Sequence, residues 1–414
     1  SANTDIFYIK GSFGNQAVSS SVGSHTYTFS CVNSSNSMEL HLVVNAAIVI
    51  DNVSAKPNDV YLTIKEAVDA LGVNGGNVIV ESGDYAIDGT GNKTTIEIPS
   101  NCTITGNGNV NITVTANVTL FKNTGFGTEA RTRINISGMK IYVNMSSGGY
   151  QQNLIHFKGL INGTIQDFTI SAATGAVAAD KAAIKLEGFY REDNAVDYPC
   201  SGIVVTRNSI EKFSVGISLK GFDVDHQDCT ENMVTGNLIK TCTNAVVLDQ
   251  APFNIISGNN ITGSSTCAMK TLGSDMNSIV GNIVANGDAD GVVIDQSYGC
   301  VISGNAFAHN TTRDLHLKSA NSSYKSKFHS ISGNTFNNEA ATGDHIGISL
   351  DENALYNSLS GNSHRVVSAS AFGVKESSQA SGTEKNLITS SVCIGGTPVS
   401  LGSGTDSIDA NNKK

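Results

Sequence analysis

The densest group of acidic residues lies in the segment Asp223–Asp228. Alternate side chains of an extended chain share one side, so Asp223 and Asp225 are expected to face the same way, with His226 beside them. Two converging carboxylates suit acid–base cleavage of a polysaccharide or binding of a Ca²⁺ ion. A solvated turn is the simpler interpretation, because Gly221 precedes the segment. These three residues are therefore the catalytic candidates only if the protein is an enzyme.

Two other loops carry groups of a similar kind. The segment Asn286–Gly291 holds two aspartates, but its Asn and Gly residues fit a turn, and its spacing falls short of an EF-hand loop. The insertion Phe189–Asp193, which ends at Tyr198–Cys200, is charged and aromatic. Long loops on a regular wall often bind ligands, although a packing or intersubunit role explains this insertion equally well.

No motif for a resident metal or cofactor is present. The nine histidines form no HxH or HxxxH pair, and no P-loop, dinucleotide fingerprint or Gly-x-Ser-x-Gly occurs. The cysteines form no CxxC pair, so a zinc site is not expected. They are interpreted as buried thiols or, in an extracellular protein, as disulfides within or between chains: Cys31, Cys102, Cys200, Cys229, Cys242, Cys267, Cys300 and Cys393.

The composition narrows the class of protein further. Charged residues make up 15% of the 414 residues, against about 25% in a typical soluble domain. The excess of 36 acidic over 26 basic residues argues against a nucleic-acid partner. No run of 18 apolar residues occurs, so membrane insertion is not expected. The start at Ser1 is interpreted as a mature or trimmed N-terminus, which favours an extracellular or cell-surface location.

A Gly-Asn pair recurs after short apolar segments, every 22 to 29 residues. Such a period suffices for one coil of three short strands and three turns, and both residue types tolerate the positive φ of tight bends. Stacked asparagines can also hydrogen-bond from coil to coil. The six clearest copies are Gly236-Asn237, Gly258-Asn259, Gly281-Asn282, Gly304-Asn305, Gly333-Asn334 and Gly361-Asn362.

The segments around this repeat complete the predicted architecture. A second strand follows each Gly-Asn pair by about ten residues, for example at 245–248 and 291–294. Residues 60–71 have the apolar spacing of an amphipathic helix, followed by Gly75-Gly76 and a strand. We therefore predict an N-terminal β module over 1–56 that joins subunits, a parallel β-helix over 57–405, and a polar tail over 406–414.

Over residues 57–400, this pattern resembles the right-handed parallel β-helix proteins of the pectate-lyase-like superfamily. The resemblance implies an all-β fold with a short capping helix at the N-terminal coil, and this fold serves many unrelated functions. The Asn-, Thr- and Gly-rich repeat also resembles the β-solenoid sheath and surface-layer proteins of methanogenic archaea.

The ends of the second strands carry charges of alternating sign. Equivalent positions of a solenoid lie about 4.8 Å apart, where opposite charges attract and like charges repel. The pattern predicts a structural charge ladder that fixes the register of the coils. The alternative is that Glu187, Asp249, Asp295 or Asp351 is catalytic. The ladder comprises Lys158, Glu187, Lys220, Asp249, Lys270, Asp295, Lys318, Asp351 and Lys375.

Two functions follow from these features. The first is an extracellular structural protein that assembles with copies of itself, by stacking or lateral pairing, into an amyloid-like sheath or surface layer. The alternative is a polysaccharide-active β-helix enzyme, such as a lyase, a hydrolase or a phage tailspike, that uses acidic residues in a lateral groove. The absence of Trp argues against strong glycan binding, since broad aromatic side chains commonly contact sugars.

The charge ladder predicts the effect of Asp295→Lys. The new ammonium group would stand between Lys270 and Lys318, so three like charges would follow one another and the solenoid or its assembly should be destabilised. Thermal unfolding of the variant beside the parent measures the effect. Equal melting and equal assembly of the two proteins would show that the ladder has no structural role.

Overall fold

The computed structural model describes residues 23–30, 37–44, 47–50 and 63–410, except for gaps at 127, 192–195, 224–227, 320–324, 339–344, 352, 367–370, 378–385, 396 and 402–407. The chain divides into two units, Ser1–Ala47 and Ile48–Lys414. In the first unit, β1 (Gly23–Ser30) and β2 (Ser37–Val44) form an antiparallel hairpin. Residues 1–22 of the predicted N-terminal β module lie outside the described residues.

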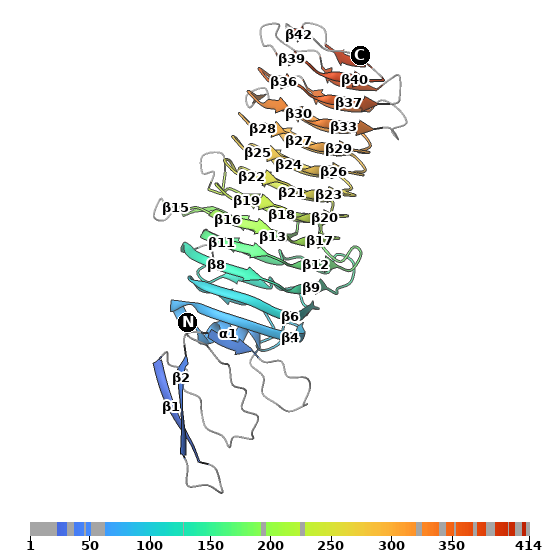
Figure 1. Ribbon diagram of the computed structural model, residues 1–414. Coiled ribbons are helices and arrows are strands. Elements are labelled where there is room, and N and C mark those ends of the chain that lie inside the picture. The colour runs from blue at the N-terminus through green and yellow to red at the C-terminus, as the bar shows by residue number, and fades with distance from the viewer. Residues whose placement is uncertain are drawn as a thin grey trace. The chain divides into compact units, whose positions relative to one another are not determined.

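The second unit begins with a helix that covers the first coil. Helix α1 (Ile64–Ala70) starts with a capping box, in which Thr63 Oγ1 accepts from the Glu66 amide and Glu66 Oε2 accepts from the Thr63 amide. Its apolar side chains Ile64, Ala67 and Val68 are buried. The 3₁₀ helix η1 (Gly72–Asn74) then leads into the solenoid, and α1 lies beside β4 at the N-terminal end of the stack (Figure 1). The predicted capping helix is thus confirmed.

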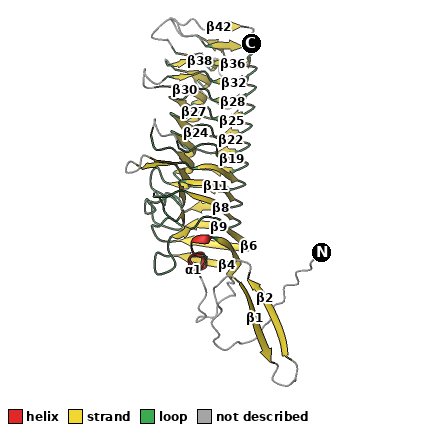
Figure 2. Ribbon diagram, turned by 90° about the vertical axis from the view of Figure 1, so that its left-hand side faces the viewer, coloured by secondary structure: helices red, strands yellow, loops and turns green. Residues whose placement is uncertain are grey.

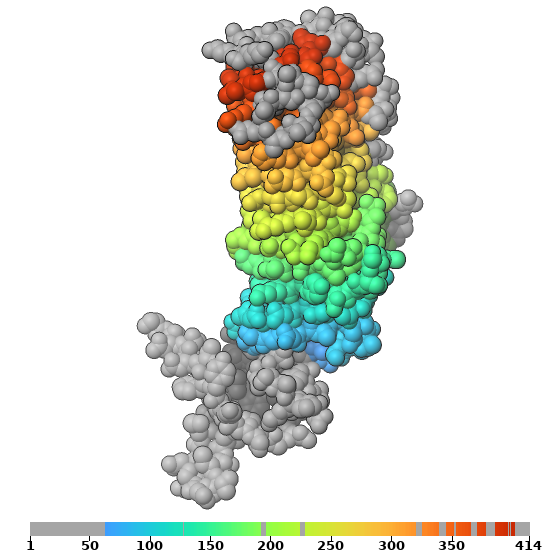
Figure 3. Space-filling model, turned by 90° about the vertical axis from the view of Figure 1, so that its right-hand side faces the viewer, coloured from blue at the N-terminus to red at the C-terminus, as the bar shows by residue number. Residues whose placement is uncertain are grey.

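The rest of the unit is a parallel β-helix, as the sequence predicted. Figures 2 and 3 show its coils stacked in chain order. A twelve-stranded sheet forms one side: β5 (Ile96–Ile98), β7 (Phe121–Asn123), β10 (Ile155–Lys158), β13 (Ala182–Glu187), β18 (Val215–Lys220), β21 (Asn244–Asp249), β24 (Cys267–Leu272), β27 (Asp290–Asp295), β30 (Arg313–Lys318), β34 (Ile346–Leu350), β38 (Phe372–Glu376) and β41 (Thr397–Ser400).

A second sheet contains two rows of strands, with β4 (Gly76–Ile87) and β6 (Cys102–Val114) spanning both rows and β3 (Ala47–Ile50) pairing with β4. The first row comprises β8 (Arg131–Ser137), β11 (Leu160–Gln166), β16 (Ser201–Thr206), β19 (Met233–Thr235), β22 (Ile255–Ser257), β25 (Ser278–Val280), β28 (Val301–Ser303), β32 (Ser330–Ser332), β36 (Ser358–Ser360), β39 (Leu387–Thr389) and β42 (Ile408–Ala410). The second row comprises β9 (Lys140–Val143), β12 (Thr169–Ala172), β17 (Ser209–Glu211), β20 (Leu238–Lys240), β23 (Asn260–Thr262), β26 (Ile283–Ala285), β29 (Ala306–Ala308), β33 (Thr335–Asn338), β37 (Ser363–Val366) and β40 (Val392–Ile394).

Two further sheets of two strands each are not part of the two large sheets. One is the antiparallel hairpin of β14 (Phe189–Arg191) and β15 (Val196–Tyr198), and the other is the parallel pair β31 (Ser326–Lys327) and β35 (Ala354–Leu355). At the far end of the solenoid, β42 pairs in register with β39. The repeat therefore continues into the segment that the sequence assigned to a polar tail.

A ladder of buried asparagines joins the coils at the Gly-Asn turn, as predicted. Each Nδ2 donates to the Oδ1 of the next asparagine at 2.9–3.1 Å, and each also donates to a backbone carbonyl. A glycine with a φ of +61° to +66° precedes six of the seven asparagines, which explains the recurrent Gly-Asn pair, and Arg207, with a φ of +55°, precedes Asn208. The ladder comprises Asn208, Asn237, Asn259, Asn282, Asn305, Asn334 and Asn362.

Stacked aliphatic side chains fill the interior. Ile256, Ile279, Ile302 and Ile331 stand in register on successive strands and are fully buried. The seven described cysteines are buried and unbridged, in agreement with the buried-thiol interpretation: Cys102, Cys200, Cys229, Cys242, Cys267, Cys300 and Cys393. The side chains of Cys200 and Cys229 lie close enough to interact. Disulfides within or between chains stay a prediction. Cys31 lies outside the described residues.

Removing one member of the asparagine ladder should destabilise the protein strongly. In Asn282→Ala, the amide of Asn259 loses its acceptor at 2.9 Å and the carbonyl of Ile256 loses its donor at 2.9 Å. Because buried unsatisfied groups cost about 1–3 kcal/mol each, the free energy of unfolding should fall by about 3 kcal/mol or more. Urea unfolding measures the change. The control is Asn260→Ala, which truncates an exposed asparagine on the neighbouring strand; equal losses in the two variants would contradict a role for the ladder.

Candidate functional site

The outer face of the twelve-stranded sheet carries a compact group of ionisable side chains on three adjacent strands. Their positions follow from the register, which pairs Asp295 with Lys318 and Val293 with His316. The amide of Asp351 donates to the carbonyl of Leu317 at 2.9 Å, so Asp351 continues this pairing just after β34. The group, termed here the acidic cluster, comprises Asp290, Asp295, Arg313, His316, Lys318 and Asp351.

Arg313 holds Asp290 in a two-pronged ion pair. Its Nε donates to Asp290 Oδ1 at 2.8 Å and its Nη2 donates to Oδ2 at 3.1 Å. Such paired hydrogen bonds fix the orientation of a carboxylate as well as its charge. Asp290 is therefore a rigid part of the cluster.

His316 lies between two carboxylates. Its Nδ1 is 3.2 Å from Asp290 Oδ2 and its Nε2 is 2.7 Å from Asp351 Oδ2, and the residue is only 3% exposed. Both ring nitrogens can donate only when the imidazole is protonated. Burial lowers the pKa of His316, but the hydrogen bonds to Asp290 and Asp351 outweigh burial and raise the pKa above its ordinary value.

The three carboxylates of the cluster have different surroundings. Burial raises the pKa values of Asp290 and Asp351, but hydrogen bonds from His316 outweigh it and hold both below the usual range. The Asp351 side chain is also 36% exposed, so an ionised oxygen can meet a ligand. Asp295 is 7% exposed; its Oδ2 lies 3.7 Å from Lys318 Nζ, and its Oδ1 has no hydrogen-bond partner among the described residues.

This arrangement can do acid–base chemistry. It places the ionised, oriented carboxylate of Asp351 at the surface, and Asp295, with an oxygen available for a hydrogen bond, lies two coils away in the same column, beyond Lys318. Two carboxyl groups in different environments are what hydrolysis of a glycosidic bond requires.

The residues that the sequence nominated for catalysis are elsewhere. Asp223 is half-buried in the bend after β18, and Asp225 and His226 lie outside the described residues. The sequence pattern around Asp290 indicates a turn, and no sequence motif includes Arg313 or His316. The available signal was that His316 and Lys318 alternate with Leu315 and Leu317, which places both polar side chains on the outer face.

The predicted charge ladder is correct in part. Lys158, Glu187, Lys220 and Asp249 stand in one column in register, with ion pairs of 2.9 Å for Lys158–Glu187 and for Lys220–Asp249. Leu272 occupies the next position, so Asp295 neighbours Leu272 and Lys318. The Asp295→Lys variant would thus bring two ammonium groups together and not three.

Two assignments to the ladder are wrong. Lys270 aligns with Val247 and Val293, and Lys375 aligns with Ser349. Both lysines face outward but lie two residues before the expected position, because a shift of two residues preserves the face of a strand and changes the column.

A second charged group lies on the same sheet nearer the N-terminus. Glu187 meets His156 Nε2 at 3.0 Å, Lys158 Nζ at 2.9 Å, and Lys185. Burial raises the pKa of Glu187, but the hydrogen bond from His156 and the charge of Lys185 outweigh it, so the pKa lies well below the usual range. Burial lowers the pKa of His156. Glu187 is therefore a fixed anion.

The hairpin β14–β15 follows directly after Glu187 at the end of β13, and β15 is labelled in Figure 1. The rings of Phe189 and Tyr198 stack at 4.6 Å, and Lys158 Nζ lies 5.5 Å from the centre of the Phe189 ring. These contacts give the aromatic insertion a packing role at its base.

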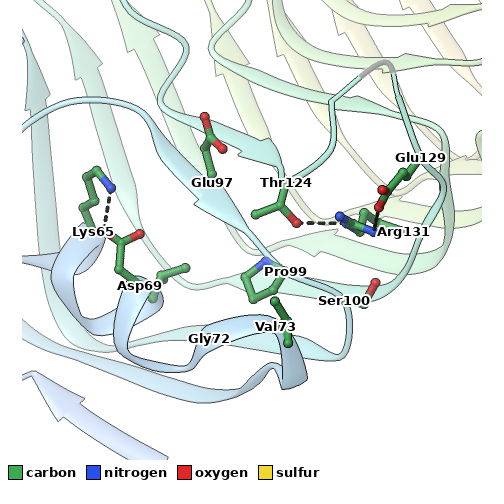
Figure 4. Close-up of a pocket in the computed structure, with 11 residues that line it drawn as sticks. Lys65, Asp69, Gly72, Val73, Glu97, Pro99, Ser100, Thr124, Glu129 and Arg131 are labelled. Carbon is green, nitrogen blue, oxygen red and sulfur yellow. Dashed lines mark hydrogen bonds and ion pairs between the residues drawn. The ribbon is translucent and has the colours of Figure 1, made fainter.

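A hollow of about 510 Å³ lies between α1 and the loops after β5 and β7 (Figure 4). Lys65 pairs with Asp69 at 2.5 Å and Arg131 with Glu129 at 2.7 Å. Glu97 pairs with Lys122 at 2.9 Å. Since each charged group that lines the hollow has an ionic partner, it offers less chemistry than the acidic cluster.

Comparison with known proteins defines the family. Residues 133–346, just over half of the chain, match the family described as "Periplasmic copper-binding protein (NosD)". The chain belongs to the NosD family. The match includes Asp290, Asp295 and the cluster residues of β30, and it ends five residues before Asp351. No curated protein matches the chain.

Solved structures share the fold at low sequence identity. The catalytic domain of a GH87 α-1,3-glucanase matches with a TM-score of 0.64 and 12% identity, over 88% of this chain and 68% of the glucanase chain. The tailspike of E. coli bacteriophage HK620 has a TM-score of 0.57 and 12% identity, over 91% and 70%. The adhesin PfbA of Streptococcus pneumoniae has a TM-score of 0.52 and 14% identity, over 85% and 95%. These matches establish the β-helix fold.

The position of His316 predicts how stability depends on pH. Because its pKa is raised on folding, its stabilising contribution is complete below the unfolded value of about 6.5 and disappears as pH rises through the folded value. The difference in melting temperature between the parent and His316→Gln should therefore be largest near about pH 5.5 and shrink toward about pH 9. The control is His309→Gln at an exposed turn. A difference that stays constant with pH would contradict the assigned protonation.

Proposed function

We propose that this protein is a polysaccharide hydrolase whose active site is the acidic cluster. The observation that carries the proposal is the buried imidazole of His316 between Asp290 and Asp351, with Asp295 on the same face. If the cluster served only as a set of structural ion pairs, the buried Oδ1 of Asp295 would be expected to have a hydrogen-bond partner, but it has none among the described residues. The three-dimensional likeness to a glucanase and a tailspike is compatible with this function but carries only the fold.

The residues of the cluster divide the reaction between them. Asp351 is exposed and held ionised by His316, so it is the base that activates a water molecule. Asp295 supplies the proton for the leaving glycosidic oxygen. His316 and the Asp290–Arg313 pair are positioning residues, since they fix the Asp351 carboxylate from behind.

The charge of the site favours a neutral polymer. The ionised carboxylates of Asp290 and Asp351 face Arg313 and a protonated His316, so these four charges cancel. The whole chain has a net charge of −10, which opposes the approach of a polyanion. A neutral polysaccharide is therefore the preferred substrate class.

Copper is the ligand that the family description names, and the described residues do not fit it. Among them, no three His, Cys, Asp or Glu side chains form a group that could hold a metal ion. Burial also raises the pKa values of the Cys102, Cys267 and Cys300 thiols to about 12, so they are protonated at neutral pH, whereas copper binds the thiolate. No step of the proposed reaction uses a metal.

An extracytoplasmic location accords with the family description and with a polymeric substrate. In the described part of the chain, the α-helix has 7 residues, far fewer than the roughly 20 that span a bilayer. We further propose that the protein is secreted to the cell surface.

Self-assembly into a sheath remains a separate prediction. Helix α1 covers the first coil with Ile64, Ala67 and Val68, which opposes end-to-end stacking through that end. Lateral pairing is the mode that the structure leaves open. The likeness to archaeal sheath proteins also stays a prediction.

Replacement of the two proposed catalytic carboxylates tests hydrolysis directly. Release of reducing ends is measured from α-1,3-glucan, cellulose and chitin, with polygalacturonate as the acidic comparison. Asp351→Asn and Asp295→Asn should each lower the rate at least about 100-fold and should each remain folded, which a melting curve checks. Asp167→Asn, which breaks an exposed ion pair with Arg207, is the control and should retain full activity.

Two results would reject the proposal. One is a parent protein that releases no sugar from any of these polymers. The other is activity that survives in both cluster variants.

A further inference from the structure

In the described coils from β6 to β36, one position takes a positive φ just before the strand of the first row or within its first three residues. These positions stand in register along the solenoid. The residue types change abruptly along this column. The N-terminal coils have Asn101, Arg133, Asn162, Gly202 and Glu231, and the later coils have Phe253, Met276, Gly299, Phe328 and Tyr356.

Large side chains at these later positions lower the stability of the fold, so folding by itself does not explain their presence. Bulky residues seldom adopt a positive φ, and such strained conformations typically cost about 1–3 kcal/mol and cluster at functional sites. Burial does not compensate for the strain. Phe253 is 57% exposed, Phe328 48% and Tyr356 41%.

Together these side chains make a continuous exposed row. Tyr298 precedes Gly299 and fills the place of the missing side chain: its ring lies 5.2 Å from that of Phe328, which lies 5.2 Å from that of Tyr356. Met276 and Tyr298 are 46% and 38% exposed. The row, termed here the aromatic corner, comprises Phe253, Met276, Tyr298, Phe328 and Tyr356.

Three members of the aromatic corner, Tyr298, Phe328 and Tyr356, lie in the coils that carry the acidic cluster, and Phe253 and Met276 lie in the two coils before them. Tyr298 follows Asp295 by three residues, and Tyr356 follows Asp351 by five, so each strand of the cluster leads into a turn of the corner. The N-terminal coils, which lack the cluster, have polar residues in the same column. The aromatic residues therefore accompany the cluster.

We propose that the aromatic corner is a polysaccharide-binding strip that holds a glycan chain along the solenoid axis beside the acidic cluster. This inference rests on the proposed function, which identifies the bound polymer as a polysaccharide. One side chain per coil provides repeated apolar contact for the CH groups of successive sugars. Polar groups accompany the row and suit sugar hydroxyls: Lys327 Nζ lies 5.6 Å from the centre of the Phe328 ring, and outward Ser278, Ser330 and Ser358 occupy the adjacent strands.

The test compares binding in the Asp351→Asn background, so that the polymer is not consumed. In one variant, Phe253, Phe328 and Tyr356 are replaced by Gly, the residue that occupies this column at Gly202 and Gly299 and accepts its positive φ. The fold should survive the change, which a melting curve checks. Tyr142→Ser is the matched control, because Tyr142 is also 41% exposed but lies on β9 in the other row.

Retention on insoluble α-1,3-glucan, cellulose and chitin is the readout. The triple variant should bind at least about tenfold more weakly than the Asp351→Asn protein to whichever polymer retains that protein. The Tyr142→Ser variant should bind this polymer like the Asp351→Asn protein. Equal binding of the triple variant overturns the inference, and so does a background protein that none of the three polymers retains. Sedimentation tests the other occupant: a dimer that the triple substitution dissociates, with glycan binding unchanged, would make the corner a contact between copies.

These results separate the two proposals. Cleavage by the parent with unchanged binding of the triple variant rejects the aromatic corner alone. Glycan binding that depends on the corner, without cleavage by the parent, supports the corner and rejects hydrolysis.

Discussion

The structure depends on the constant rise from one coil to the next. Parallel strand pairing sets this rise at about 4.8 Å, and the buried asparagine ladder enforces it at the sharpest turn. Each asparagine satisfies both the side chain and the backbone of its neighbour, so a coil cannot shift without leaving several buried polar groups unpaired. The aliphatic stacks inside the solenoid and the columns outside it follow from this register.

The register turns a repetitive scaffold into a support for chemistry. Side chains on successive coils come within hydrogen-bonding range although about 25 to 35 residues separate them in sequence, as His316 does with Asp290 and Asp351. The same spacing that lets Lys158 and Glu187 pair also holds Asp295 beside Lys318. A column of charges can therefore be structural in one part of the sheet and chemical in another. The two parts of the sheet differ in the burial of their charged side chains, in the number of ionic partners that each carboxylate has, and in the exposure of Asp351.

The outer surface changes character along the axis. In the N-terminal coils, polar residues occupy the positive-φ turn, and Glu187 is surrounded by His156 and lysines. In the later coils, aromatic residues occupy that turn and three carboxylates lie on the adjacent sheet. The interior also changes along the axis: in one column of the second row, Val284 is followed by Phe307, Phe336 and His364, whose rings stack at 4.8 and 4.6 Å. The difference between coils therefore concerns both the surface and the packing of the core.

The sequence by itself determined the fold, the capping helix and the asparagine ladder. Those features depend on local rules, namely the period of the repeat, the tolerance of Gly and Asn for positive φ and the alternation of apolar residues. Only the tertiary structure decided the site. The column in which a side chain stands depends on where its strand begins. A shift of two residues leaves Lys270 on the outer face of the sheet but moves it out of the column of Asp249 and Asp295. His316 likewise has no sequence neighbour that identifies its role, because its two carboxylate partners come from other coils.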